Sequence, residues 1–392
     1  MDKIYFDNAA TTYVRPEVLD IMLPFFSERY GNPSSIYEIA RDSKKALEHA
    51  REQVAKALGA QPEEIFFTGS GTEADNWAIR GIADLYKNRG NHIITSSIEH
   101  HAVLHTCQYL DKNGFETTYL PVDGDGLISL EDLEKAIRPS TTLITIMTAN
   151  NEIGTLQPVK EIGEIARKRG IAFHTDAVQA VGHVPIDVKA MNIDLLSLSA
   201  HKLYGPKGVG VLFVKKGVPL KPLIFGGGQE RNRRAGTENV AGIVALGAAI
   251  ELASGELGEE SARLSKIRDK IIDGILSSIP HTRLNGSREK RLPNNVNISF
   301  QFIEGESLLL LLDMKGIYAS SGSACTSGSL DPSHVLLAIG LPHETAHGSL
   351  RLTLGRGSTE EQADYLLQEL PAIVSRLRDM SPLYEDYLKR KG

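Results

Sequence analysis

The chain has 392 residues, of which 41% are hydrophobic and 23% charged, and this length predicts about two or three domains of an ordinary globular enzyme. A formal net charge of −6 without a long basic run argues against nucleic acid as the main partner. The sequence shows no signal pattern at its start and no uninterrupted apolar run of about 18 residues, so no membrane span is expected. The only cysteines, Cys107 and Cys325, make neither a disulfide framework nor a four-thiolate metal site, which predicts a reducing, cytoplasmic environment.

The first 60 residues predict a short extended piece followed by helices. Residues 4–12 end in small polar side chains, and helical patterning follows from 17 to about 30. Glycine, asparagine and proline in residues 31–35 predict a turn. A long amphipathic helix is then expected from about 37 to 58, because its apolar residues recur at helical spacing.

From residue 64 the pattern changes to alternating strands and helices, which predicts a mostly parallel sheet with helices on both faces. In such sheets ligands lie at the carboxyl ends of the strands. Strands are predicted at 65–68, 93–96, 117–120, 143–147, 171–174, 195–198 and 209–214, with helices at 72–88, 101–113, 130–137 and 159–169.

The last third has a mixed order of elements, which predicts a second, smaller α+β unit. A helix is expected at 239–253 and a separate charged helix at 259–278; the rest reads as strands at 296–300, 317–319 and 349–353 with helices at 306–315, 334–339 and 359–378. We therefore expect an α/β protein with a large domain, residues 16–258, and a small domain made of residues 1–15 and 259–392.

Polar residues follow five of the predicted strands, and the first two groups each have more than one interpretation. The turn Gly69-Ser70-Gly71-Thr72 opens a helix, where backbone amides favour an anion, although it equally suits a plain connector. His100 either caps the next helix or stacks on a flat cofactor. A metal site at His100 and His101 is disfavoured, because adjacent side chains diverge and no third ligand is visible.

The remaining strand ends carry Asn151, then Asp176 with Gln179, and finally Lys202. A lone lysine after a strand is most often a solvated surface charge, but a desolvated amine forms a Schiff base with a carbonyl. An anion cradle, a carboxylate, a flat ring and such a lysine together fit pyridoxal phosphate (PLP). In that cofactor the carboxylate keeps the pyridine nitrogen protonated, so that the ring accepts electrons from a substrate carbanion.

Three further residues outside these strand ends bear on the chemistry. Cys325 lies in a run of serines and glycines at 320–329, which predicts either an incidental exposed thiol or a nucleophile on a moving loop. Cys107 lies on an apolar helix and is expected in the core. Arg351 is suited to gripping a substrate carboxylate, or else pairs with an ordinary acidic residue.

Taken together, these motifs resemble the cysteine desulfurases, a group within the fold-type I, class V aminotransferase-like enzymes. The resemblance runs from residue 4 to the final helix. It rests on Tyr5-Phe6-Asp7-Asn8-Ala9-Ala10-Thr11-Thr12, Gly71-Thr72-Glu73-Ala74-Asp75-Asn76, Glu99-His100, Asn150-Asn151-Glu152-Ile153-Gly154, His174-Thr175-Asp176-Ala177-Val178-Gln179, Ser199-Ala200-His201-Lys202, Gly236-Thr237 and Ser323-Ala324-Cys325-Thr326-Ser327.

The resemblance implies a role for each of these positions. Lys202 is the implied cofactor-bearing lysine and proton shuttle, and Cys325 the implied sulfur-accepting nucleophile. His100 is the implied catalytic residue that stacks on the ring and handles protons. Asp176 is expected at the pyridine nitrogen and Gln179 at the ring phenolate oxygen. The implied phosphate ligands are Gly71, Thr72, Ser199 and His201, with Thr237 from the neighbouring subunit, and the implied substrate ligands are Asn32, Asn151 and Arg351.

The implied activity is conversion of L-cysteine to L-alanine with transfer of sulfur to a Cys325 persulfide, which supplies iron–sulfur cluster assembly. A homodimer and an iron–sulfur scaffold protein are the implied partners, and other sulfur acceptors are possible ones. No resident metal is expected; Cys325 meets a cluster only transiently. The alternatives are a selenocysteine lyase or another class V enzyme, and a non-catalytic sulfur carrier.

The subtype stays open. The tail, residues 381–390, is similar to the scaffold-docking tail of housekeeping desulfurases, whereas residues 345–349 are closer to nitrogenase-associated ones.

Overall fold

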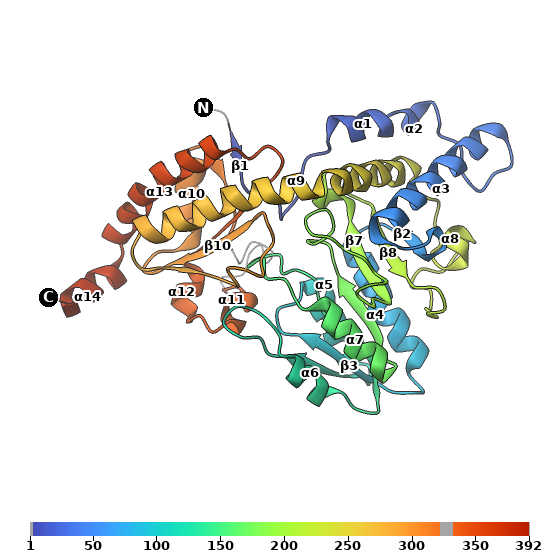
Figure 1. The fold of residues 1–392 in the computed structure, drawn as a ribbon, viewed down its shortest axis with the longest axis horizontal. Helices are drawn as coiled ribbons and strands as arrows, with labels where there is room; N and C mark the ends of the chain where they lie inside the picture. The colour runs from blue at the N-terminus through green and yellow to red at the C-terminus, as the bar shows by residue number, and fades with distance from the viewer. Residues whose placement is uncertain (1–2, 322–331, 392) are drawn as a thin grey trace.

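The computed structural model describes residues 3–321 and 332–391, and a seven-stranded sheet forms the larger of its two parts (Figure 1). The strand order is β2-β8-β7-β6-β5-β3-β4, and only β8 runs antiparallel to its neighbours. The predicted mostly parallel sheet is thus confirmed. Its strands are β2 Ile65–Thr68, β3 His92–Ser96, β4 Glu116–Leu120, β5 Thr141–Thr145, β6 Ala172–Asp176, β7 Leu195–Ser199 and β8 Gly210–Val214.

Helices cover both faces of this sheet because successive side chains of each strand point to opposite sides. Ile93 and Leu195 pack with Trp77 in the cluster under α4 and α5. Their neighbours Ile94 and Leu196 pack in the opposite cluster with α3, α7 and α9. The helices of this part are α3 Glu38–Leu58, α4 Gly71–Tyr86, α5 His101–Asp111, α6 Leu130–Ala136 and α7 Val159–Arg169.

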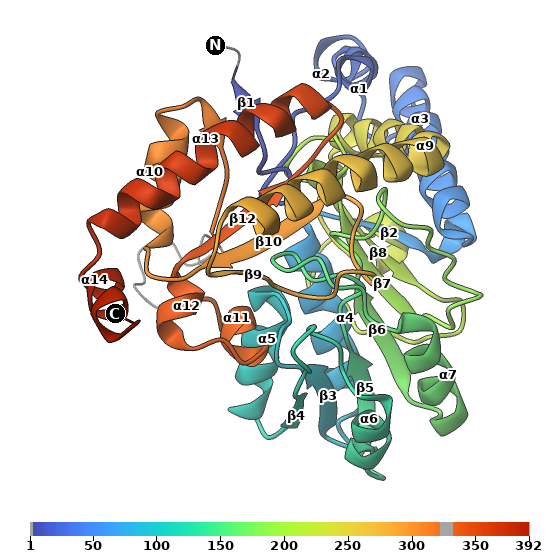
Figure 2. The same ribbon diagram turned by 60° about the vertical axis from the view of Figure 1, so that its left-hand side comes forward.

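The smaller part has its own three-stranded antiparallel sheet and its own buried cluster (Figure 2). Strand β10 lies between β9 and β12, and the short strands β1 and β11 pair beside them. The N-terminal strand therefore belongs to the same part of the fold as the C-terminal elements. The elements are β1 Ile4–Tyr5, β9 Thr282–Leu284, β10 Asn295–Phe300, β11 Ile317–Tyr318, β12 Ser349–Thr353, α10 Gly305–Asp313 and α13 Glu360–Asp379.

Helix α9, Val240–Ser278, runs without a break through both parts, and the predicted interruption between 253 and 259 is wrong (Figure 1). The segment contains Gly255 and Gly258, but a glycine inside a helix costs only about 1 kcal/mol. Tertiary contacts offset that cost, since Glu256 accepts hydrogen bonds from Arg15, at 2.7 and 3.1 Å, and bonds to Arg356. The predicted domain boundary near 258 stays a prediction.

By length and composition alone, α9 is also apolar enough to cross a membrane. Half of the apolar window is buried within the fold. Leu246 and Ile250 pack in the core of the larger part, and Ile267 and Ile271 in the core of the smaller part. A core helix of a globular protein passes the same test, so the match is weak support for a membrane span.

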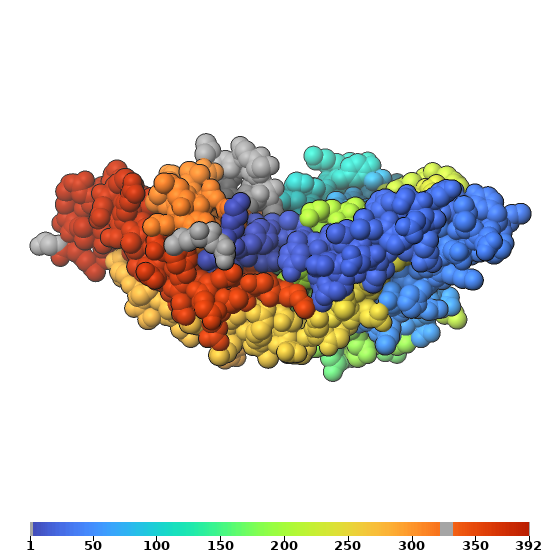
Figure 3. Space-filling model, turned by 90° about the horizontal axis from the view of Figure 1, so that it is seen from above, coloured from blue at the N-terminus to red at the C-terminus, as the bar shows by residue number. Residues whose placement is uncertain are grey.

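Other differences from the predicted elements are local. The helix expected at 17–30 is divided into α1 Pro16–Met22 and α2 Pro24–Ser27, because Pro24 has no N–H to continue the first helix. The α1 to α3 helices lie at one end of the molecule and the C-terminal helices at the other (Figure 3). Short elements that the sequence did not predict are α8 Gln229–Asn232, α12 His343–His347, α14 Pro382–Lys391 and β9; the expected helix at 334–339 is α11 His334–Ala338.

The turn that follows β5 depends on Gly154, and substituting it gives a testable prediction. Gly154 has a positive φ of 73°, and a Cβ there would meet Asn295 Cγ at 2.6 Å. Gly170 has a similar φ of 64° with nothing near a Cβ. We expect Gly154→Ala to lower the free energy of unfolding by about 2–4 kcal/mol and Gly170→Ala by about 1 kcal/mol in urea titrations. Equal losses would show that the contact with Asn295 is unimportant.

Candidate active site

The polar residues predicted at five strand ends lie along one edge of the sheet. Strands β2, β7, β6, β5 and β3 run in the same direction, so their carboxyl ends meet there. In sheet order these ends lead to Thr72, Lys202, Asp176, Asn151 and His100. The predicted shared edge is confirmed, and it is where ligands of parallel sheets bind.

The turn after β2 reaches this edge by crossing the antiparallel strand β8. A Cβ on Gly210 of β8 would meet the Ser70 carbonyl carbon at 2.6 Å, so only glycine permits the crossing. A Cβ on Gly71 would likewise meet Val178 at 2.7 Å and Ser199 Cβ at 3.5 Å. The first turn of α4 is therefore held against the ends of β6 and β7, where its amides and its positive dipole favour an anion.

Three predicted site residues converge on the N-terminal segment. The Lys202 amine donates to the carbonyls of Ala9, at 2.5 Å, and Ala10, at 2.8 Å. Gln179 Nε2 donates to the same Ala9 carbonyl at 3.0 Å. The His201 ring bonds to the Thr11 hydroxyl at 3.1 Å. The sequence placed residues 9–11 in the family motif but gave no signal that they would cover the lysine.

Asp176, the last residue of β6, is a buried carboxylate. Burial raises its pKa to about 6, although the Val178 amide, which donates at 2.9 Å, and the charge of Lys202 act in the opposite direction. Asp75 of α4, which is 1% exposed, lies beside it, and burial followed by the charge of Asp176 raises the pKa of Asp75. His174 Nε2 lies 3.7 Å from Asp75, but burial lowers the pKa of His174 to about 3. The two are therefore a neutral contact rather than an ion pair.

His100 caps α5, as one of its two interpretations predicted. Its Nδ1 accepts from the Ala102 amide at 3.2 Å, which fixes the orientation of the ring. Burial, followed by the charge of Lys202, lowers the pKa of His100 to about 4, so the ring is neutral at physiological pH. A cluster of imidazoles adjoins it, with the His101 ring 5.0 Å from that of His334. Across residues 3–321 and 332–391, no group of three or more potential ligands is arranged to hold a metal ion.

Arg351, although only 2% exposed, already has a carboxylate partner within the chain. It donates to Asp7 Oδ1 at 2.9 Å and to the Asn151 carbonyl at 3.3 Å. Its Nε is buried with no hydrogen-bond partner, so one donor remains for a further acceptor. The ion-pair interpretation of Arg351 is thus confirmed, and its role toward substrate stays a prediction.

The structure does not bring every predicted residue to this place. Asn32 and Thr237 are exposed, and Asn32 Oδ1 accepts the Ser34 amide within its own turn. Cys325 lies outside the described residues. Cys107 is buried in the core, as predicted, and burial raises the pKa of its thiol.

Glu152 is a buried residue of the site that sequence reasoning named only within a motif. Its carboxylate bonds to the Ser333 hydroxyl, which in turn caps α11 by accepting from the Val335 amide at 3.1 Å. Its carbonyl accepts from Asn295 and Asn297 of β10, each at 3.0 Å. Glu152 therefore ties the sheet edge to the smaller part of the fold. No local sequence pattern reveals this link, because the partners are more than 140 residues away.

The residues at the edge fit PLP as the group to be held. The amides at the start of α4 form an anion cradle that a side chain at position 71 would fill. Asp176 is a buried carboxylate that suits a protonated ring nitrogen, and Lys202 would supply an amine for the aldehyde. Phosphate, ring and aldehyde thus each have a matching chemical group along one edge.

Comparison with known proteins gives the same result at the level of family. The aminotransferase class-V model matches residues 4–366, so the chain belongs to this family. The chain is 62% identical over 391 residues to a protein named cysteine desulfurase IscS from Clostridium botulinum strain Hall, covering 99% of this chain and 98% of that one. It is 63% identical over 380 residues to a cysteine desulfurase IscS from Methanosarcina thermophila, covering 97% and 94% respectively.

Solved structures agree with this assignment. A NifS-like protein superposes with a TM-score of 0.90 at 43% identity, covering 96% of this chain and 100% of that one. A structure of SspA in complex with cysteine superposes with a TM-score of 0.81 at 43% identity, covering 90% and 98%. The resemblance to cysteine desulfurases is thereby confirmed, and so is the class V fold.

The buried carboxyl group of Glu152 predicts a pH dependence of stability. Burial raises the pKa of Glu152 from 4.5 to about 7, against the opposing effects of Ser333 and Arg351. Between these values the folded state binds more protons than the unfolded state, so raising the pH lowers the free energy of unfolding. Urea titrations should show that wild-type stability falls relative to Glu152→Gln by about 3 kcal/mol across this range and then levels off.

Parallel pH curves for wild type and Glu152→Gln would contradict the prediction. Glu134→Gln, the loss of an exposed carboxylate on α6, is the matched control, and its curve should follow that of the wild type.

Proposed function

We propose that this chain is a PLP-dependent cysteine desulfurase that converts L-cysteine to L-alanine and passes the sulfur to Cys325. The observation that carries the proposal is the convergence of Lys202, Gln179 and the buried Asp176 at one sheet edge. The identity of 62% to a named cysteine desulfurase over nearly the whole chain supports the same reaction.

The bound cofactor supplies an electron sink for the substrate carbanion. Lys202 holds the cofactor and moves the α-proton of the substrate, and Asp176 provides the negative charge that a protonated ring nitrogen requires. The neutral ring of His100 offers a flat face and, because its Nδ1 accepts the Ala102 amide, an Nε2–H donor. Asn151 and Gln179 orient the ring, and the phosphate ligands are Gly71, Thr72, Ser199 and His201.

Arg351 is the proposed anchor of the substrate carboxylate, with Asn151. A buried guanidinium that already holds Asp7 at 2.9 Å is fixed in one orientation and keeps a free Nε donor. In this proposal the substrate carboxylate pairs with that remaining donor. This arrangement selects an amino acid with a free carboxylate.

In the proposed sulfur transfer, Cys325 is itself a reactant, because its thiol becomes a persulfide once for each cysteine converted. The Cys325 thiolate attacks the sulfur of the substrate; a sulfur–sulfur bond forms as the Cβ–S bond breaks. The three-carbon fragment gains a proton at Cβ and leaves as alanine, so cysteine and one thiol become alanine and one persulfide. The acceptor of the sulfur is the proposed partner, an iron–sulfur scaffold protein, and other acceptors are compatible with the same persulfide.

A homodimer is part of the proposal. Two large apolar side chains outside the helices and strands are highly exposed, Ile36 at 88% and Phe225 at 83%. Thr237 is exposed as well, which suits a phosphate ligand that is contributed to a neighbouring subunit. A cytoplasmic setting accords with the reduced thiol that the reaction requires.

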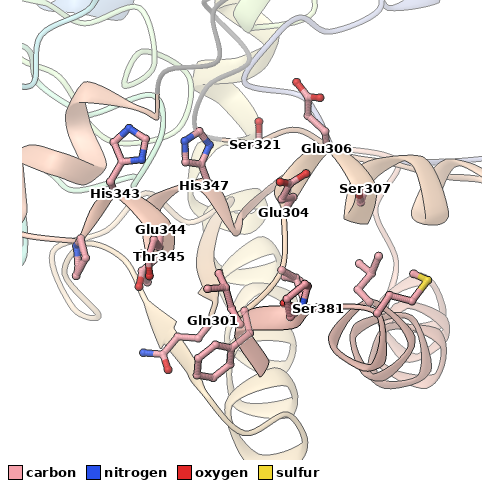
Figure 4. Close-up of a pocket in the computed structure, with 18 residues that line it drawn as sticks. Gln301, Glu304, Glu306, Ser307, Ser321, His343, Glu344, Thr345, His347 and Ser381 are labelled. Carbon is pink, nitrogen blue, oxygen red and sulfur yellow. The ribbon is translucent and has the colours of Figure 1, made fainter. Parts of the chain in front are cut away.

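A pocket beside the C-terminal helices suits the docking of the scaffold. Its volume is about 820 Å³, and it lies between α12, the start of α10 and the residues that lead into α14 (Figure 4). Ser321 and His347 line it, and a Cβ on Gly305 would meet the His347 carbonyl at 2.7 Å and Ser321 Cβ at 3.6 Å. The pocket therefore adjoins the residue at which the cysteine-bearing segment begins.

The alternative enzyme is a selenocysteine lyase or another class V enzyme. An aminotransferase needs no thiol at position 325, and a non-catalytic sulfur carrier needs neither Lys202 nor Asp176. Incubation with L-cysteine and with L-selenocysteine, followed by measurement of alanine, separates a cysteine desulfurase from a selenocysteine lyase. The colour of the purified protein separates an enzyme from a carrier.

The lysine gives a direct test. Lys202→Ala removes the amine that holds the cofactor, so we expect loss of the visible absorption of the purified protein. Alanine formation from cysteine should fall about 100- to 10,000-fold, because proton transfer is lost as well. Lys207→Ala, a loss of a lysine on the same loop, is the control. Retained absorption and activity in the Lys202 variant would contradict the cofactor proposal.

The cysteine tests the second half of the reaction. Cys325→Ser should abolish the protein-bound persulfide and reduce alanine formation about 100-fold or more, while the cofactor absorption stays unchanged. Cys107→Ser is the matched control, and persulfide labelling followed by peptide mass analysis is the measurement. Full persulfide formation in the Cys325 variant would rule out the assigned role.

A further inference from the structure

A run of left-handed backbone lies beside the proposed phosphate turn. Glu230, Arg231 and Asn232 have φ values of 43°, 58° and 62°. None of them is glycine, although three glycines, residues 226–228, lie just before Gln229. Side chains in the left-handed region are unfavourable, and such strain persists only where the surroundings impose it. The segment must therefore be held by specific contacts.

The contact that holds it is a buried ion pair of Glu230. Glu230 is 6% exposed, and Arg51 of α3 donates two hydrogen bonds to its carboxylate, at 2.8 and 2.9 Å. It also accepts the Phe67 amide of β2 at 2.9 Å. Arg51 in turn donates to the Ile65 carbonyl at 2.6 Å. Glu230 thus fixes the strained turn to the strand that leads into the phosphate turn.

The residues after the strained turn reach the phosphate turn itself. Arg234 grips Glu73 through bonds of 2.8 and 3.1 Å, and Glu73 accepts the Gly69 amide at 2.8 Å. Gly69, Glu230 and Thr237 line one cavity of about 150 Å³. The geometry of the turn at 69–71 therefore depends on where the segment 229–237 is held.

We propose that Glu230 is a positioning residue for the phosphate of the cofactor. It touches neither cofactor nor substrate, and it acts by holding the left-handed turn that sets Arg234, Glu73 and Thr237. The inference rests on the proposed function, since it concerns the same phosphate. The simpler alternative is an ion pair that stabilises α3 against β2 and has no influence on the cofactor.

Glu230→Gln is the test, because the amide keeps the shape but loses the charge and one acceptor. PLP is titrated into the cofactor-free protein, and its dissociation constant is measured by equilibrium dialysis. We expect the dissociation constant to rise at least about tenfold, with the KM for cysteine unchanged once the protein is saturated with PLP. Glu256→Gln is the matched control, since Glu256 is also gripped by an arginine, Arg15, but on α9.

A second substitution asks whether backbone strain is the cause. Glycine adopts positive φ without a steric cost, so Asn232→Gly in the Glu230→Gln background should restore part of the PLP affinity. If Glu230→Gln lowers the melting temperature but leaves the dissociation constant for PLP unchanged, the ion pair is merely structural and the inference is overturned. Failure of Asn232→Gly to restore PLP affinity would also overturn it.

The two proposals fail separately. A wild-type protein that does not bind PLP defeats the proposed function and this inference with it. A wild-type protein that binds PLP, together with a Glu230→Gln variant that binds it equally well, defeats the inference alone.

Discussion

The close contact between the Ser70 backbone and Gly210 is the constraint on which the site depends. Strand β8 lies between β2 and β7, so the turn after β2 has to cross it to reach the other strand ends. Any side chain at position 210 would lie 2.6 Å from the Ser70 carbonyl carbon. With glycine there, the start of α4 lies beside Asp176 and Ser199, and one edge offers both an anion cradle and a carboxylate.

Burial then sets the charges at that edge. Asp176 and Asp75 lie together in the core, and burial raises the pKa of both carboxyl groups. Lys202 and the Val178 amide act against this rise only for Asp176. Asp176, the last residue of β6, is therefore the member of the pair whose ionised form the lysine and the amide favour. A protonated ring nitrogen would extend the same preference, because it adds a second positive charge near Asp176.

The sequence predicted the parts of the site that depend on local patterns. Strand periodicity and the turn after each strand predicted that Thr72, His100, Asn151, Asp176 and Lys202 share an edge, since parallel strands all end at the same side. The bounds of β2, α7 and β12 agreed because apolar periodicity and flanking glycines or charges mark them. The resemblance to a family supplied the roles, which remain proposals.

What the sequence could not predict depends on contacts between distant residues. Asp7 and Arg351 are 344 positions apart, and Glu152 and Ser333 are 181 apart. The break predicted in α9 was wrong for the same reason, since Arg15 and Arg356 hold Glu256 from far along the chain. Left-handed backbone at Glu230 also gives no local signal, because glutamate is not a residue that favours it.

These distant contacts share one purpose, which is to join the smaller part of the fold to the sheet edge. Arg351 of β12 donates to the Asn151 carbonyl, and Asn295 and Asn297 of β10 donate to the Glu152 carbonyl. Lys202 donates to the carbonyls of Ala9 and Ala10 in the N-terminal segment. The proposed substrate therefore lies where both parts contribute donors, so a substitution at the junction disturbs stability and binding together.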